Sequence, residues 1–398
     1  MKSAAPKNSI SRKSGLISAT NSILSSIVCI IIGLLVGFII LVCINAEHAG
    51  EGFMTILIGG FNNINAHARN ISKEIAEAAP LIMTGLSVAF AYKTGLFNIG
   101  AAGQYSVGAL GALYFALVLH MPWYICILAA MLCGAVWGAI PGLLKAFFNV
   151  NEVITSIMFN WIALYGVNEL LKNNVLGKMY ESTKNKTYVV RTTSAGSAIP
   201  NMGLDNIFSK STTIAIFIAI IVAIIMYIII NKTTFGYELK ACGHNKDAAK
   251  YAGINEKRSI ILSMVIAGAL AGLGAALFYL SGVGEWNPND STACPAIGFN
   301  GISVALLAVC NPIGCVFSAL LISHITVGGS CLATAYYQPE IADIIIGVII
   351  YLCAFAMLFK MLIGKVVKVK STSDANADPQ IELHEPDSDK EAEKEDEE

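Results

Sequence analysis

Charged residues are scarce in this chain, and one long stretch has none at all. Only 13% of the 398 residues are Asp, Glu, Lys or Arg, whereas a soluble domain carries about one-quarter. No charged residue occurs between Gly95 and Leu144. Apolar runs of about 20 residues recur along the sequence, and each is long enough to cross a hydrocarbon core of about 30 Å. These features exclude an ordinary soluble domain and predict an all-α polytopic membrane protein.

Motifs for nucleotide hydrolysis and for metal binding are missing as well. No Gly-x-x-x-x-Gly-Lys-Ser/Thr loop occurs, so the sequence predicts no ATPase site in this chain. The six histidines show no metal-ligand spacing, and the ten cysteines include no Cys-x-x-Cys pair. We therefore expect no catalytic residues, no metal site and no cofactor in this chain, and no enzymatic activity.

Ten apolar segments between residues 23 and 363 are expected to cross the membrane. The expected spans are about 23–45, 75–92, 95–120, 123–148, 151–171, 212–230, 259–283, two that share 297–327, and 341–363. The count within 297–339 stays open, because one stretch there can be re-entrant. An N-terminal tail of residues 1–22 precedes the spans. An acidic tail of residues 364–398 follows them, and its composition predicts disorder.

Lys and Arg near the ends of the spans set the expected orientation. With the N-terminus inside, the basic loop 231–258 and the lysines after residue 359 also lie inside. The polar loop 172–210 then lies outside. It carries basic residues too, but long loops follow the rule less strictly. We therefore expect a multi-pass protein of the cell membrane with both termini in the cytoplasm.

The stretch Gly95–Gln104 is too rich in glycine and amides for a plain apolar span. Such a backbone at membrane depth must be buried in protein or line a wet cavity, which makes it a candidate lining for a transport path. Amide side chains both donate and accept hydrogen bonds, as a ribose or a purine edge requires. Hydrogen bonding between helices is the competing interpretation for each amide. The candidate path residues are Asn98, Gln104, Asn160 and Asn300.

The cytoplasmic loop 231–258 contains a short predicted helix. Asn245 is placed to cap its start, residues 246–252 give about two turns, and Gly253 is placed to stop it. A short helix held at the membrane face can dock into the cleft of a partner protein. An ordinary basic loop that only sets the orientation of the chain is the alternative.

Four motifs in this sequence resemble those of a known family. Gly243, Asn245, Ala248, Ala249, Gly253 and Ile254 match the pattern Gly-x-Asn-x-x-Ala-Ala-x-x-x-Gly-Ile, which is typical of the coupling helix of ABC importer permeases. The stretch Gly95–Gln104 resembles a signature of the simple-sugar and nucleoside permeases in the branched-chain amino acid/ribose permease superfamily. Residues 151–154, and 298–307 with 311–314, resemble two further signatures in the same order. The sequence departs from the family pattern at Ala102, where Glu is frequent, and at Asn300, where Asp is frequent.

The resemblance implies a type II ABC importer-like permease of a bacterial-type cell membrane, with about ten transmembrane helices. It implies that Gly243, Asn245, Ala248, Ala249 and Gly253 couple the chain to a separate ABC ATPase, which brings ATP and Mg. It also implies a second permease subunit, a different but related chain, and an extracytoplasmic substrate-binding lipoprotein. Lipid surrounds the chain, and no nucleic-acid partner is implied.

The substrate is implied less directly than the family. The resemblance favours nucleosides, with a simple sugar such as ribose or galactose as the alternative. An ion-coupled secondary transporter is a further alternative, but it should carry charged residues in mid-membrane, and the central spans have almost none.

Overall fold

The computed structural model describes residues 7–59, 67–204, 212–282, 284–288, 293–332, 336–338 and 340–354. The chain divides into two units, and the account below concerns the unit Ser26–Phe355. The predicted acidic tail 364–398 lies outside the described residues, as do residues 1–6 of the predicted N-terminal tail.

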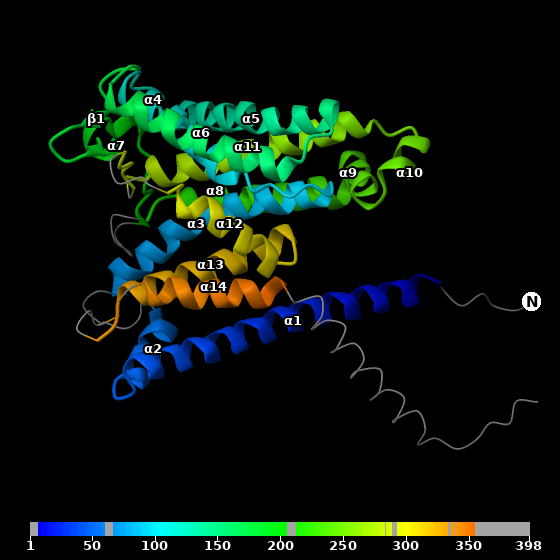
Figure 1. The fold of residues 1–398 in the computed structure, drawn as a ribbon, viewed down its shortest axis with the longest axis horizontal. Helices are drawn as coiled ribbons and strands as arrows, with labels where there is room; N and C mark the ends of the chain where they lie inside the picture. The colour runs from blue at the N-terminus through cyan, green and yellow to red at the C-terminus, as the bar shows by residue number, and fades with distance from the viewer. Residues whose placement is uncertain are drawn as a thin grey trace, which may run out of the picture. The chain divides into compact units, whose positions relative to one another are not determined.

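Long α-helices dominate the structure (Figure 1). They are α1 (Lys7–Ile44), α2 (Ala49–Ile58), α3 (His67–Lys93), α4 (Ala101–Leu117), α5 (Trp123–Phe148), α6 (Glu152–Lys172), α7 (Val190–Thr193), α8 (Ala215–Lys232), α9 (Thr234–His244), α10 (Lys246–Tyr251), α11 (Glu256–Tyr279), α12 (Ala296–Leu307), α13 (Pro312–Ser330) and α14 (Ile341–Ala354). Among the described residues, six helical segments are long and apolar enough to cross a membrane: 26–44, 68–93, 123–148, 215–232, 256–279 and 312–330.

Several helices extend beyond the predicted spans. Helix α1 begins at Lys7. No proline interrupts residues 7–44, so the helix runs without a break into the apolar span. Helix α3 begins at His67 rather than near residue 75, and it keeps Pro80 within its length. Hydropathy marks only the apolar part of a helix, so polar turns at its end escape a search for spans.

The predicted break at Asn311 and Pro312 is confirmed. Helix α12 ends at Leu307, and α13 starts with Pro312 at its first position, where a missing N–H costs nothing. The Asn311 side chain caps α13 by accepting from the backbone N–H of Ile313 at 3.0 Å. Between the two helices, Val309 and Cys310 turn the chain with positive φ values of 51° and 52°.

The centre of the unit is a close packing of α5 against α11. A methyl group added at Gly134 would overlap the carbonyl oxygen of Gly268, and one at Gly272 would overlap that of Ala130. Small residues at such positions let two helix backbones touch, which supplies the packing contact that holds helices together in a bilayer. Helices α3 and α4 pack against α11 as well.

The two ends of the helix bundle carry different structures (Figure 1). Helix α7 and strand β1 (Tyr180–Glu181) lie at one end, and α9 and α10 lie at the other. Strand β1 pairs antiparallel with β2 (Lys186–Thr187), a two-residue ladder within an otherwise mostly helical structure. The pair forms because Thr187 is also held by Trp286: the Thr187 N–H donates to the Trp286 carbonyl at 2.9 Å.

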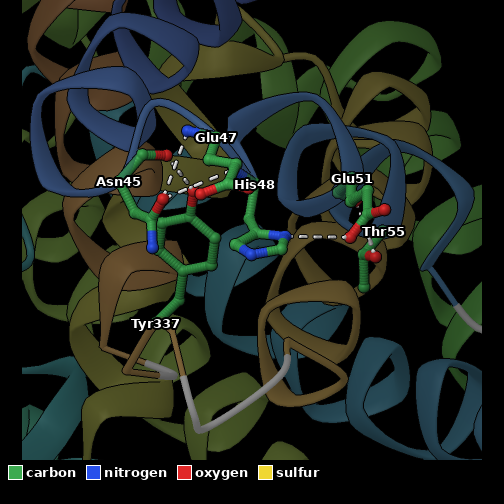
Figure 2. Close-up of polar contacts among 6 residues, drawn as sticks. All are labelled: Asn45, Glu47, His48, Glu51, Thr55 and Tyr337. Atoms are coloured by element: carbon green, nitrogen blue, oxygen red, sulfur yellow. Dashed lines mark hydrogen bonds and ion pairs between the residues drawn. The ribbon is translucent and has the colours of Figure 1, made fainter.

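Figure 2 shows the turn that joins α1 to α2. The Asn45 side-chain oxygen accepts from the backbone N–H groups of Glu47 at 3.2 Å and His48 at 3.4 Å. The Tyr337 hydroxyl donates to the Asn45 carbonyl at 2.7 Å, so a residue just before α14 holds the end of α1. The His48 ring lies 3.4 Å from the carboxylate of Glu51.

Candidate functional site: a polar junction and the loop 231–258

The segment Gly95–Gln104 joins the end of α3 to the start of α4. Its first part is fastened to the neighbouring helices: Leu96 is 1% exposed and packs with Ala91 of α3 and Met264 of α11. Directly before the segment, the Thr94 hydroxyl donates to the Ser263 hydroxyl of α11 at 2.8 Å. We call this segment, together with Ser87 and Asn160, the polar junction.

Asn98 and Gln104 form a mutual amide pair inside the junction. The Asn98 side-chain N–H donates to Gln104 Oε1 at 2.8 Å, and the Gln104 side-chain N–H donates to Asn98 Oδ1 at 3.1 Å. Asn98 also donates to the Ser87 hydroxyl of α3 at 3.0 Å. Both amides are almost fully buried. Burying an amide is costly unless it is hydrogen-bonded, and here each amide supplies the partner of the other.

Asn160 of α6 completes the start of α4. Helix α4 begins after Gly100, which has no side chain to cap it, and the first N–H groups of a helix have no partner within the helix. Asn160 Oδ1 accepts from the backbone N–H of Gly103 at 2.8 Å, and its side-chain N–H donates to the Ile99 carbonyl at 3.0 Å. A residue 57 positions away in sequence therefore acts as the cap.

Helix α12 starts beside the polar junction. The Thr84 hydroxyl, well inside α3, donates to the Ile297 carbonyl at 3.1 Å. A methyl group added at Gly298 would overlap Ala102. With 12 residues, α12 is about 18 Å long, too short to cross a membrane by itself. Ala102 is fully buried, so its environment has no room for the glutamate that is frequent in the family.

Asn300 is the exception among the four predicted path residues. It lies on the first turns of α12 and is half-buried. The other three amides, Asn98, Gln104 and Asn160, bond to partners within the chain and expose 2% or less of their surface. The structure thus brings Asn98, Gln104 and Asn160 together in the junction and places Asn300 on a neighbouring helix.

The loop 231–258, expected to be cytoplasmic, folds into two helices rather than one. The cap and stop expected for α10 are confirmed: Asn245 Oδ1 accepts from the Ala248 N–H at 3.0 Å, and Gly253 follows the helix with φ 81°. Helix α9 was not predicted, although Thr233 marks its start by accepting from the Gly236 N–H at 3.1 Å. Of the residues matched to the coupling pattern, Ala249 is buried, whereas Gly243, Asn245, Ala248 and Gly253 are exposed.

Two aromatic side chains stand out from this loop. Tyr251 at the end of α10 is 95% exposed, and Tyr237 on α9 is 71% exposed. Tyrosine is enriched among the residues that contribute most to binding at protein interfaces. On α9, partial burial and the nearby charge of Lys93 lower the pKa of Lys240 below its ordinary value.

The loop touches the polar junction through two glycines. A methyl group added at Gly243, at the end of α9, would overlap the Lys93 carbonyl oxygen. It would also lie 2.9 Å from the backbone nitrogen of Gly95. Gly95 itself has φ 74°, and a Cβ atom there would lie 3.2 Å from the Gly243 carbonyl oxygen. The two backbones therefore meet directly, with no side chain between them.

The opposite end of the unit is held by contacts between distant loops. The Trp286 indole N–H donates to Asn168 of α6 at 2.8 Å, and its backbone pairs with Thr187. Lys186 and Glu285 form an ion pair at 3.2 Å. Thr187 and Trp286 are buried in this contact, whereas the side chains of Lys186 and Glu285 remain partly exposed.

Helices α5 and α6 are linked by an ion pair at the end of the bundle that carries α9 and α10. Lys145 Nζ lies 2.9 Å from Glu152 Oε2, and the side chains are 16% and 15% exposed. Nearby, the Lys257 ammonium sits 5.2 Å from the centre of the Phe147 ring. Glu152, at the start of α6, is thus paired with a lysine of the preceding helix.

Sequence reasoning missed the hydroxyl groups in and beside the polar junction. Thr84 and Ser87 lie three residues apart on α3, so they share one face of that helix. Paired hydroxyls on one face of an apolar helix were the available signal. Ser156 of α6 belongs to the same region: its Oγ would lie 3.1 Å from a Cβ added at Gly100, and it is buried with no hydrogen bond to the described residues.

The bundle of apolar helices, with a short helix that starts beside a buried polar junction and a capped helical loop at one end, defines a polytopic membrane permease. The chain belongs to the family of permease components of the branched-chain amino acid transport system, whose model matches residues 70–354. Family membership confirms the resemblance drawn from the motifs.

Curated relatives cover nearly the whole chain. The nucleoside ABC transporter permease protein NupB of Lactococcus lactis is 36% identical over 89% of this chain and 96% of its own length. The guanosine ABC transporter permease protein NupP of Bacillus subtilis is 33% identical over 89% and 99%. The glucose ABC transporter permease protein TsgB13 of Haloferax volcanii is 28% identical over 88% and 91%. No solved structure matches the chain significantly.

Proposed function

We propose that this chain is the membrane permease of an ATP-driven importer for nucleosides. The similarity to NupB and NupP carries the substrate assignment, because both names specify nucleosides and both matches span most of the chain. The similarity to a glucose permease keeps a simple sugar as the second candidate. The sequence contains no nucleotide-binding loop, so ATP and Mg enter through a separate ATPase.

The α9–α10 loop is the proposed docking element for that ATPase. Asn245 and Gly253 define a short helix between two turns, and Tyr251 projects almost fully exposed from its end. A rigid knob with an exposed aromatic side chain fits a cleft on a partner. In this proposal, Asn245, Ala248 and Gly253 form the contact surface, and buried Ala249 supports α10 from below.

A second permease, a different but related chain, is proposed to complete the path. Asn98, Gln104 and Asn160 are hydrogen-bonded inside the chain, so they shape the polar junction and hold the start of α4 in place. Asn300 is the amide with remaining exposure, and we assign it the direct contact with the solute. The substrate-binding lipoprotein would dock at the end of the bundle where Lys186 and Glu285 are partly exposed.

The proposed topology has ten crossings of the cell membrane within the permease domain, residues 23–363, and both termini in the cytoplasm. Helix α12 and the residues before it would together form one of these crossings, with α12 in the cytoplasmic half of the membrane. Single cysteines at residues 184 and 250, in a background without other reactive thiols, test the orientation in whole cells. An impermeant maleimide should label position 184 only; labelling at 250 would contradict it.

Uptake by the reconstituted importer tests the substrate. The permease, its second permease, the ATPase and the binding lipoprotein would be reconstituted in lipid vesicles. ATP would be supplied on the side of the membrane on which the ATPase is bound. We expect ATP-dependent uptake of labelled guanosine that unlabelled uridine or adenosine reduces and that glucose, ribose and galactose leave unchanged. Uptake of a free sugar without nucleoside uptake would establish the second candidate instead. Uptake driven by an ion gradient without ATP would contradict both.

A further inference from the structure

We propose that His324 and Glu74 form a proton-binding site that controls the attachment of α2 to the rest of the bundle. Three helices meet at this site. Glu74 belongs to α3 and His324 to α13, and both side chains lie against the end of α2. The site is separate from the polar junction and from the loop 231–258, and it does not depend on the identity of the solute.

The His324 ring is bound at both of its nitrogen atoms. Nδ1 lies 3.1 Å from Glu74 Oε1, and Nε2 lies 2.9 Å from the carbonyl oxygen of Leu57, the last residue but one of α2. The His324 side chain is 27% exposed and that of Glu74 is 12% exposed. A methyl group added at Gly59 would overlap the ring, so there is no free space on that side. The ring is therefore held in one position between α2 and α3.

These two contacts need one proton more than a neutral imidazole and a carboxylate hold together. A carbonyl oxygen only accepts, so Nε2 must donate its N–H to Leu57. In a neutral ring, Nδ1 would then present a lone pair to the lone pairs of an ionised Glu74. The contact at 3.1 Å is a hydrogen bond only when a proton lies between Nδ1 and Oε1, whichever atom carries it. His324 and Glu74 thus bind this proton together, and its release to solvent leaves two acceptors facing each other.

The bound proton stabilises the C-terminal end of α2. The last four carbonyl groups of a helix have no partner within it, and the C-terminus of a helix attracts positive charge. His324 supplies both a donor and a positive charge at this point when the ring carries the proton. Backbone packing holds the same turn, since a methyl group added at Gly328 of α13 would overlap the backbone of Ile56. Loss of the proton removes the polar part of this attachment.

Both residues lie in segments that are long and apolar enough to cross a membrane, 68–93 and 312–330. Ionisable residues within such segments are costly, and they mark functional sites. Among the described helices that pack against α13, the other charged residues and histidines are His67, Arg69, Lys73, Glu77 and Lys93 on α3, Glu51 on α2, Lys232 on α8, and Asp343 on α14. Glu74 is the charged group among the described residues that contacts the ring.

The site makes the attachment of α2 depend on pH. Helix α2 lies at the end of the bundle that carries α7 and β1 (Figure 1), which is outside the cell in the proposed topology. A proton that is bound in the folded state stabilises that state at low pH, and the stabilisation is lost as the pH rises. Acidity therefore keeps the end of α2 attached, and an alkaline medium releases it.

Thiol labelling at two positions of α2 tests the site. Ile56 is fully buried, whereas Met54 on the same helix is 53% exposed. Ile56→Cys and Met54→Cys would be made separately in a background without other reactive thiols. The detergent-purified proteins would be labelled with a maleimide at about pH 6 and about pH 9, on either side of the usual range of histidine. Because the thiolate is the reacting form, the rate at position 54 corrects for the direct effect of pH on labelling.

The measured quantity is the labelling rate at position 56 divided by the rate at position 54. With His324 and Glu74 present, we expect this ratio to rise about tenfold from the lower to the higher pH, as the loss of one charge-assisted hydrogen bond predicts. In Glu74→Gln the ratio should stay low at both pH values, because the glutamine N–H donates to Nδ1 of a neutral ring and no further proton is needed. His48→Gln removes the other histidine–glutamate pair of this region, that with Glu51, and as the matched control it should keep the tenfold rise.

A ratio that does not change with pH in the presence of His324 and Glu74 would overturn the proposal. A rise that persists in Glu74→Gln would overturn it as well, because the proton would then be bound elsewhere. The unfolding temperature gives a second measurement that needs no added cysteine. Wild type and His48→Gln should both lose stability relative to Glu74→Gln as the pH rises, and a pH-independent difference would show that Glu74 has only a structural role. None of these results depends on transport, so failure of the proposed function would be seen separately.

Discussion

Asn98 and Gln104 exchange two hydrogen bonds, at 2.8 and 3.1 Å, across the turn that leads from α3 into α4. Each amide therefore satisfies the other within the stretch from Gly95 to Leu144, which contains no charged residue. The pair closes the turn, with Ser87 as its link to α3. It gives the polar junction a defined conformation in an otherwise apolar bundle.

Removal of one member of this pair should destabilise the protein. In Gln104→Leu, the Asn98 carbonyl oxygen loses its donor while it stays buried, which costs about 1–3 kcal/mol. Thermal unfolding of the detergent-purified protein measures the loss. Gln338→Leu, the same change at an exposed position, should have almost no effect. The double variant Asn98→Leu/Gln104→Leu should lose less than the sum of the single variants, and strict additivity would contradict the pairing.

The contact between α4 and α12 predicts a steric effect at Gly298. Gly298→Ala places a methyl group against the backbone of Ala102, and such overpacking typically costs about 1–3 kcal/mol. Gly347→Ala on α14 is the matched control, since a methyl group there would meet nothing within 4 Å. Unfolding temperatures of the two variants give the comparison. Equal temperatures would mean that α12 does not start against α4.

The ion pair between α5 and α6 predicts a difference between two glutamates. Glu152→Gln leaves Lys145 uncompensated in a site where both side chains are about one-sixth exposed. We expect a loss of about 1–3 kcal/mol, less than for a fully buried pair. Glu285→Gln breaks the pair with Lys186, in which the lysine is 46% exposed and the glutamate 31% exposed. This change should lower the free energy of unfolding by less than about 1 kcal/mol. The unfolding temperatures of the two variants test this order, and a larger loss for Glu285→Gln would reverse the interpretation.

The exposure of Tyr251 predicts an effect on assembly without an effect on folding. Tyr251→Ala removes a side chain that is 95% exposed, so the unfolding temperature of the isolated permease should not change. If the side chain is an interface anchor, binding of the ATPase should weaken by about 2 kcal/mol, or roughly thirtyfold. Met202→Ala, a truncation at a position 79% exposed in the loop before α8, is the control. Unchanged ATPase binding in Tyr251→Ala would remove this residue from the docking surface.

Local signals made part of the structure predictable. Asn245 and Gly253 bound α10 because a cap and a left-handed stop act within a few residues of the chain. Asn311 and Pro312 mark the start of α13 for the same reason. Helix α9 was not predicted. Its one local signal is the Thr233 cap, and this residue lies in a loop whose basic residues were used only to predict the orientation of the chain.

The partners of the amides were not predictable from local signals. Asn98, Gln104 and Asn160 were predicted as candidate path residues because they are amides in apolar surroundings, but composition cannot tell which of them bond to each other. The Asn160 cap joins positions 57 apart, and the Thr84 contact to α12 joins positions 213 apart. Such contacts depend on how the helices pack, which hydropathy does not encode.

The sequence by itself determined that this is a polytopic helical membrane permease, because apolar length, scarce charge and short-range motifs act locally along the chain. The tertiary structure alone decided that Gly243 meets Gly95, that Asn160 caps a helix to which it does not belong, and that α12 begins against Ala102. The physical reason is the close approach of backbones in lipid: where glycines bring helices into contact, the identity of each partner is set by packing, and packing involves the whole bundle.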